Sequence, residues 1–160
     1  MAAFQEDSFI LGGEDGAERV FGEIVTPEYF RLLGVDPVLG RTMSEDEREP
    51  VVVLSEALVE RRFGHASEIV GRTIELNDLR FVVIGVLPAT FQGFSGQTRL
   101  WGMSLFDVLN PVLVQYDILG NRGTRWHAVL GRLVDGVELG EARAEMDTIA
   151  AALSETYPTS

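Results

Sequence analysis

One serine and two histidines are the side chains that offer hydrolytic chemistry in this sequence. Ser95 lies in residues 93–97 (GFSGQ), which lack the closing glycine of the GxSxG turn of serine hydrolases. A Ser-His-Asp arrangement would need His65 or His127 as its base. His65 follows a predicted helix end and His127 stands beside Trp126 in a predicted strand, so we expect ordinary surface or half-buried roles for both. The sequence predicts no catalytic residue, with a serine hydrolase that uses Ser95 as the alternative.

A run of acidic residues is the second candidate for chemistry. It comprises Glu45, Asp46, Glu47 and Glu49, and carboxylates are ligands that calcium prefers. The run lacks the alternating Asp/Asn spacing and the central glycine of an EF-hand loop. Ser44 and Glu47 instead have the spacing of a helix capping box. We interpret the run as a solvated helix start, with a calcium site as the alternative.

Aromatic residues in the second half of the chain form a third candidate, an apolar ligand groove. They are Phe91, Phe94, Trp101, Phe106 and Trp126. Core packing is the simpler interpretation, because aromatic side chains supply much of the buried area of any folded domain. A free-standing periplasmic ligand-binding module that uses these residues is the alternative from another functional class.

Two residue types are missing, and their absence excludes whole classes of function. Cysteine is absent, which excludes disulfides, thiolate nucleophiles and cysteine-based zinc sites. All 13 basic residues are arginines, so no lysine is available for a P-loop or a Schiff base. A formal charge of −12 opposes binding to a phosphate backbone. We therefore predict no cofactor, no metal and no nucleic-acid partner.

The strands that must position these residues follow from apolar patterning within one domain of ordinary size. They are predicted at residues 18–25, 51–54, 73–76, 80–87 and 126–133. Residues 9–11 and 20–25 flank a glycine-rich turn and should form a hairpin, and Asn77-Asp78 is the turn of a second hairpin. Residues 51–54 are apolar without interruption, which is typical of a strand buried on both faces.

Helices are predicted between and after these strands. Thr26, as N-cap, begins a short helix that ends before Gly34, and Ser55 caps an amphipathic helix that ends at Gly64. The longest helix spans residues 138–155. We expect its apolar stripe to pack onto the sheet as a structural brace. The stripe comprises Leu139, Ala142, Met146, Ile149 and Leu153.

No segment is apolar enough to cross a membrane. The longest uninterrupted apolar run, residues 81–87, is far shorter than the roughly 18 residues that a spanning helix needs. We therefore expect the chain by itself to be soluble. The residues alone predict an acidic domain of mixed α/β class without a visible active site.

Short motifs follow one another in a recognisable order along most of the chain. They are residues 25–30 (VTPEYF), 33–35 (LGV), 39–41 (LGR), 51–55 (VVVLS), 62–64 (RFG), 70–77 (VGRTIELN), 81–86 (FVVIGV), 100–101 (LW) and 129–133 (VLGRL), followed by the helix from residue 142 to 157. This succession resembles the MacB-like periplasmic core domain of ABC transporter permeases of the macrolide-exporter and FtsX-like type. Each motif alone is weak, whereas their order is specific.

The resemblance implies an α+β fold, with residues 1–160 forming a single two-lobed domain. A porter-like βαβ lobe would combine residues 1–50 with 126–160, and residues 51–125 would form a β-rich insertion. The domain would lie on the periplasmic or extracellular side of the plasma membrane, between the first two membrane helices of a permease.

The same resemblance implies a non-catalytic domain that couples ATP-driven conformational change to export or to partner proteins. The implied partners are the transmembrane helices of its own permease, a cytoplasmic ABC ATPase that acts indirectly, a second permease copy, and a membrane fusion or accessory protein. The matching positions are mostly glycines, prolines and apolar residues, which specify turns and packing. They name no substrate.

Overall fold

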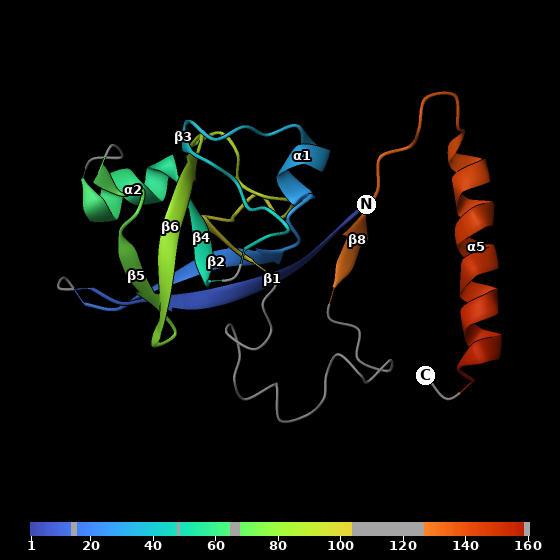
Figure 1. The fold of residues 1–160 in the computed structure, drawn as a ribbon, viewed down its shortest axis with the longest axis horizontal. Helices are drawn as coiled ribbons and strands as arrows, with labels where there is room; N and C mark the ends of the chain where they lie inside the picture. The colour runs from blue at the N-terminus through green and yellow to red at the C-terminus, as the bar shows by residue number, and fades with distance from the viewer. Residues whose placement is uncertain (14–15, 48, 65–67, 104–126, 159–160) are drawn as a thin grey trace.

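The computed structural model describes residues 1–13, 16–47, 49–64, 68–103 and 127–158 (Figure 1). Its strands are β1 (Ala2–Leu11), β2 (Glu18–Val25), β3 (Leu39–Gly40), β4 (Val51–Ser55), β5 (Thr73–Leu76), β6 (Leu79–Leu87), β7 (Leu100–Met103) and β8 (Ala128–Leu130). Its helices are α1 (Tyr29–Leu33), α2 (Glu56–Phe63) and α5 (Leu139–Thr156). In Figure 1, α1 and α2 lie against a curved sheet, whereas α5 stands apart from it.

The sheet is mixed and closes on itself. Its strands follow the order β2-β7-β4-β6-β5-β1-β8, and β3 pairs with β6. β1 also pairs with β2 in antiparallel fashion, so the path from β2 to β1 returns to its start. The β1–β5 junction is narrow, since these strands meet only at the pair Leu11 and Leu76. β4 runs parallel to β6, and β2 runs parallel to β7. This mixed sheet with a few helices confirms the expected α+β class.

Two apolar cores lie on opposite faces of the sheet, and β4 contributes to both. Val52 and Leu54 enter the core that α2 covers, whereas Val51 and Val53 enter the core that α1 covers. Alternation follows from strand geometry, because successive side chains point to opposite faces. All four residues are at most 3% exposed. The prediction that residues 51–54 are buried on both faces is confirmed.

Local turn and cap signals place several boundaries where they were predicted. Asn77 and Asp78 have φ of 51° and 64°, the left-handed backbone that a tight two-residue hairpin requires. The Ser55 hydroxyl accepts a hydrogen bond from the backbone N–H of Leu58 at 3.2 Å and so caps α2. Gly34 ends α1 with φ of 71°.

The predicted start of the first helix was wrong by two residues. The Thr26 hydroxyl accepts from the backbone N–H of Ala3 at 3.1 Å, and the Thr26 N–H donates to the Ala3 carbonyl at 3.0 Å. Thr26 therefore extends the β1–β2 ladder and is not the helix cap. Helix α1 begins at Tyr29, with Glu28 in the N-cap position.

The predicted capping box of Ser44 and Glu47 was also wrong, since no helix begins there. The Glu47 carboxylate forms an ion pair with Arg41, and the Glu47 backbone N–H reaches the Ser44 carbonyl at 3.3 Å. These contacts make a single turn. A capping box does occur at the start of α5, where Glu138 and Glu141 satisfy each other's backbone N–H groups.

The end of the chain differs from expectation in two respects. β8 is shorter than the predicted strand at 126–133, of which residue 126 lies outside the described residues, and it pairs with residues 2–4 of β1. The predicted packing of α5 onto the sheet was wrong. Its apolar residues Leu139, Met146, Ile149 and Leu153 are 46–55% exposed, because no described element covers that face. Arg132 links the segment before α5 to the domain by donating to the Leu32 carbonyl at 2.6 Å.

No described helix is both long and apolar enough to span a membrane.

Candidate functional site

A fully buried glutamate forms the polar centre of the domain. Glu23 of β2 is 0% exposed, and each of its two oxygens accepts two hydrogen bonds. Oε2 accepts from the Tyr29 hydroxyl at 2.5 Å and from Trp101 Nε1 at 2.9 Å. Oε1 accepts from the Thr98 hydroxyl at 2.8 Å and from the backbone N–H of Phe94 at 2.9 Å. A buried carboxylate is tolerated only when such donors replace water, so this group ties α1, β7 and the loop of residues 91–98 to β2.

The surroundings of Glu23 are tight. Burial, the hydrogen bond to Glu23 and the charge of that carboxylate raise the pKa of Tyr29 far above its usual range. A side chain at Gly93 would place its Cβ 2.4 Å from both Glu23 Oε1 and Thr98 Oγ1. Gly93 also has φ of +69°, a conformation that glycine adopts at little cost. The glycine lets the loop approach the carboxylate.

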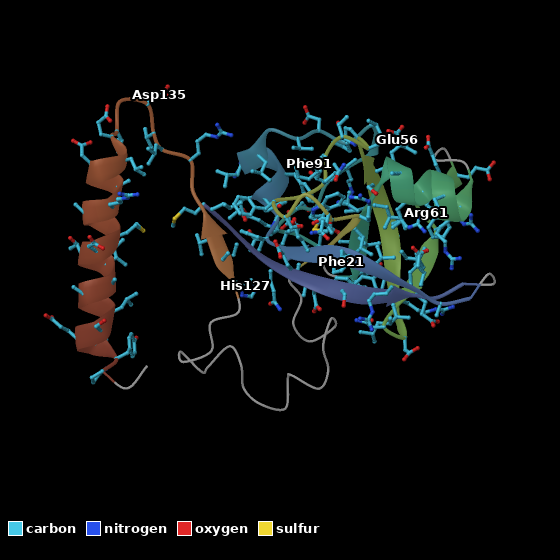
Figure 2. The ribbon with its side chains drawn as sticks, turned by 180° about the vertical axis from the view of Figure 1, so that it is seen from behind. Phe21, Glu56, Arg61, Phe91, His127 and Asp135 are labelled. Carbon is cyan, nitrogen blue, oxygen red and sulfur yellow. The ribbon has the colours of Figure 1, made fainter. Side chains whose placement is uncertain are left out.

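Ser95 does not have the surroundings of a nucleophile in the described part of the chain. Its hydroxyl lies 3.2 Å from Thr98 Oγ1 and accepts from the Gln97 N–H at 3.3 Å. His127 is half-buried just before β8, where burial lowers its pKa (Figure 2). His65 lies outside the described residues. Among the described residues no histidine lines the cavity beside Ser95, and this geometry does not support the serine hydrolase alternative. The loop instead binds Glu23 through the Phe94 N–H and the Thr98 hydroxyl.

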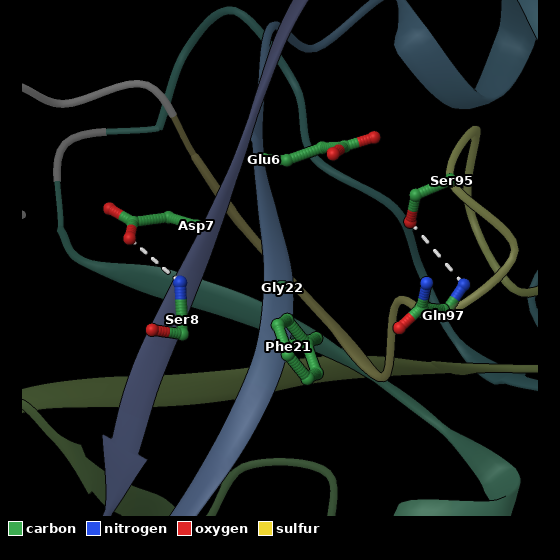
Figure 3. A pocket seen from close by; sticks show the side chains of 7 residues that line it. All are labelled: Glu6, Asp7, Ser8, Phe21, Gly22, Ser95 and Gln97. Carbon is green, nitrogen blue, oxygen red and sulfur yellow. Dashed lines mark hydrogen bonds between the residues drawn. The ribbon is translucent and has the colours of Figure 1, made fainter.

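A shallow groove lies beside this loop (Figure 3). Its volume is about 260 Å³. The lining residues come from β1, β2 and the loop: Glu6, Asp7, Ser8, Phe21, Gly22, Ser95 and Gln97. In Figure 3 the Glu6 side chain extends toward the loop that carries Ser95 and Gln97, whereas Asp7 points away and accepts from the Ser8 N–H at 2.7 Å.

The acidic run does not converge on one point. Glu47 pairs with Arg41, and the hydrogen bond from that guanidinium lowers the pKa of the Glu47 carboxyl. Glu45 and Asp46 border a separate surface hollow that Arg31 also lines. Within the ranges that the structure describes, no group of three or more Asp, Glu or His side chains could hold a metal ion. The geometry thus gives the calcium alternative no support.

The predicted aromatic groove is divided between core and surface. Trp101 is fully buried and stacks with Phe91 at a centroid distance of 5.2 Å, on the face of the sheet that carries α1. Phe91 is labelled in Figure 2. Phe94 is 61% exposed and packs against Phe4 at 5.0 Å. Phe106 and Trp126 lie outside the described residues. Phe91 and Trp101 therefore belong to the packed core and do not line a groove.

Sequence reasoning missed both the Glu23 centre and the groove. One signal was available for the first, since Glu23 interrupts the otherwise apolar end of β2 (Val20–Val25). A charged residue inside a buried strand predicts a buried partner set. The groove gave no signal, because Glu6 and Phe21 are distant in sequence from Ser95 and Gln97.

The chain is similar to known sequences over nearly its whole length. It matches the family described as the MacB-like periplasmic core domain over residues 2–149. It is also 39% identical over 67 residues to the macrolide export ATP-binding/permease protein MacB of Bdellovibrio bacteriovorus. That match covers 40% of this chain and 10% of the relative, so the shared stretch is a small part of a much longer protein.

Solved structures share the fold at low sequence identity. The periplasmic region of MacB from Actinobacillus actinomycetemcomitans superposes with a TM-score of 0.65 at 20% identity, covering 95% of this chain and 65% of that one. The extracellular domain of the ABC-type transporter YknZ from Gram-positive bacteria gives a TM-score of 0.53 at 17% identity, covering 66% of this chain and 55% of that one. These similarities concern the fold.

Proposed function

This chain belongs to the family of MacB-like periplasmic core domains, and we propose from that premise that it is the extracytoplasmic domain of an ABC transporter permease. The domain would transmit ATP-driven conformational change to export or to partner proteins. The observation that carries the proposal is the family match over residues 2–149. The shared fold with the periplasmic region of a MacB, which covers 95% of this chain, supports it.

Strand β1 is suited to transmit motion, because it touches both cores. It is 10 residues long, or about 33 Å at 3.3 Å per residue. Phe4 near its start packs in the core under α1, whereas Phe9 and Leu11 near its end pack in the core under α2. A displacement that enters at the start of β1 would therefore reach both halves of the domain.

The two-lobed organisation stays a proposal. Residues 1–50 with 126–160 would form the porter-like lobe, and residues 51–125 the β-rich lobe. Pairing of β8 with residues 2–4 of β1 supports the union of the two end segments. The hydrogen bond from Arg132 to the Leu32 carbonyl adds a second contact between them.

The partners of the domain are proposed from the family. They are the transmembrane helices of its own permease, a cytoplasmic ABC ATPase that acts indirectly, a second permease copy, and a membrane fusion or accessory protein. The half-exposed apolar face of α5 supports a contact with another part of such an assembly, since four large apolar side chains on one helix are 46–55% exposed. We further propose that the domain is not an enzyme, because no histidine among the described residues lines the groove beside Ser95.

The coupling role is tested in the full-length permease by measuring ATP hydrolysis and drug export together. A macrolide is a suitable transport probe, since the sequence relative is named for macrolide export. Ile149→Ala removes an apolar side chain from the exposed stripe of α5, and Glu145→Ala is its control on the polar face. We expect Ile149→Ala to lower the amount exported per ATP hydrolysed and Glu145→Ala to leave it unchanged. Hydrolysis and export at wild-type levels in both variants would contradict the proposed coupling role of α5.

A further inference from the structure

The groove beside residues 93–98 carries negative charge that no described residue neutralises. Glu6 lies directly opposite Glu23 in the β1–β2 ladder, and like charges at opposite positions destabilise a sheet. All oxygens of Glu23 are occupied by donors, whereas Glu6 is exposed and forms no hydrogen bond or ion pair with the described residues. Within the part of the chain that the structure describes, no arginine lines the groove, and the Arg99 guanidinium donates to the Thr98 carbonyl at 2.9 Å.

An exposed aromatic ring lies next to this charge. Phe21 is 56% exposed and lines the groove together with Glu6. A guanidinium can stack on such a ring while it donates hydrogen bonds to a carboxylate. The hydroxyls of Ser8 and Ser95 and the amide oxygen of Gln97 add further acceptors along the lining. These groups together suit a planar cation with several donors.

The size of the groove indicates what kind of molecule would carry that cation. Its volume of about 260 Å³ is below the roughly 300–1,000 Å³ of pockets that enclose a small ligand. A single long side chain fits such a space while the rest of its protein stays outside. Arginine is also among the residues enriched at the energetic centres of protein interfaces.

We propose that the groove formed by Glu6, Phe21, Ser95 and Gln97 is a docking site for an arginine side chain of a partner protein. The inference rests on the proposed function, because it names the surface through which the extracytoplasmic domain would contact its partner. The interaction is electrostatic and solvent-accessible, so it weakens as salt concentration rises.

The test is a nuclear magnetic resonance titration of the isotope-labelled 160-residue chain with a defined probe. The probe is the acetylated and amidated peptide Leu-Arg-Leu, and the comparison peptide has citrulline, which is uncharged, in place of arginine. We expect the arginine peptide to shift the backbone amides of Ser8, Phe21, Ser95 and Gln97 saturably, with a Kd on the order of 1 mM for one anchored side chain. The citrulline peptide should not shift the resonances of these amides.

Variants of the chain locate the binding. Glu6→Gln should weaken binding of the arginine peptide by roughly two- to fivefold, as expected for loss of one exposed charge pair. Phe21→Ala should weaken it to a similar extent. Glu75→Gln removes the same charge from an exposed position on β5 and should leave the Kd unchanged. The amide spectrum of each variant reports whether its fold is retained.

Three outcomes would overturn the docking site. Equal shifts with both peptides would indicate apolar adsorption, and shifts spread over all acidic surfaces would indicate non-specific attraction. Shifts of the groove amides that grow with protein concentration in the absence of peptide would assign the groove to a second copy of this chain. Because the titration needs neither a membrane nor ATP, its failure would leave the coupling proposal standing, and failure of coupling would leave the titration result intact.

Discussion

Replacement of the buried glutamate is the sharpest perturbation that the fold offers. Glu23→Gln keeps the size of the side chain but changes one carboxylate oxygen into an NH2 group. Each oxygen of Glu23 accepts two hydrogen bonds, so two donors lose their acceptor whichever way the amide turns. A buried donor left unsatisfied costs about 1–3 kcal/mol. The variant should therefore lose roughly 2–6 kcal/mol out of the roughly 5–15 kcal/mol that stabilises a domain.

The assay is equilibrium unfolding in urea, followed by circular dichroism. We expect a lower midpoint at an unchanged slope, since the surface exposed on unfolding stays the same. A loss of about 3 kcal/mol corresponds to a fall in Tm of roughly 6–12 °C for a chain of this size. Glu75→Gln on β5, which is exposed, is the matched control and should stay within about 0.5 kcal/mol of wild type. A Glu23→Gln midpoint equal to that of wild type would refute the role given to the Glu23 centre.

Further predictions concern pH, backbone space and the last helix. The raised pKa of Tyr29 means that its phenol stays protonated in the folded chain while the unfolded chain ionises near pH 10, so stability should fall as pH rises above about 10. The part of the absorbance change at 295 nm that Tyr29→Phe removes should appear only on unfolding. Tyr29→Phe should also reduce the alkaline loss of stability. Gly85→Ala should prevent folding or cost several kcal/mol, because its Cβ would lie 2.1 Å from the Arg41 carbonyl oxygen; a circular dichroism spectrum and Tm like those of wild type would contradict this. In the isolated chain Ile149→Ala should shift Tm by less than about 2 °C, because Ile149 is 46% exposed. Leu54→Ala should lower the free energy of unfolding by about 2–5 kcal/mol, because Leu54 is 0% exposed. Equal losses of stability in the two variants would show that α5 packs against the domain in solution.

The parts of the fold that sequence predicted depend on neighbouring residues. The hairpin at Asn77-Asp78 and the cap at Ser55 are set by two to four adjacent residues, so their signals are present in any short window. The Glu23 centre is different, because Thr98 and Trp101 lie 75 and 78 residues away along the chain. No local pattern states that such residues meet.

The last helix shows a second limit of sequence patterns. Leu139, Met146 and Ile149 fall at helical spacing, and α5 forms where that spacing predicts it. The stripe indicates which face of the helix is apolar and carries no information on what covers that face. Likewise, the spacing of Ser44 and Glu47 matched a capping box, but Glu47 instead forms an ion pair with Arg41.

Labelling of a single cysteine in the full-length permease tests most directly the claim that this domain lies outside the membrane. The chain contains no cysteine, so Glu60→Cys on the exposed face of α2 introduces one reactive site into it. In a permease whose other cysteines have been removed, a membrane-impermeant maleimide should label this site in right-side-out membrane vesicles and leave it unlabelled in inside-out vesicles. Labelling confined to inside-out vesicles would place the domain in the cytoplasm and contradict the account.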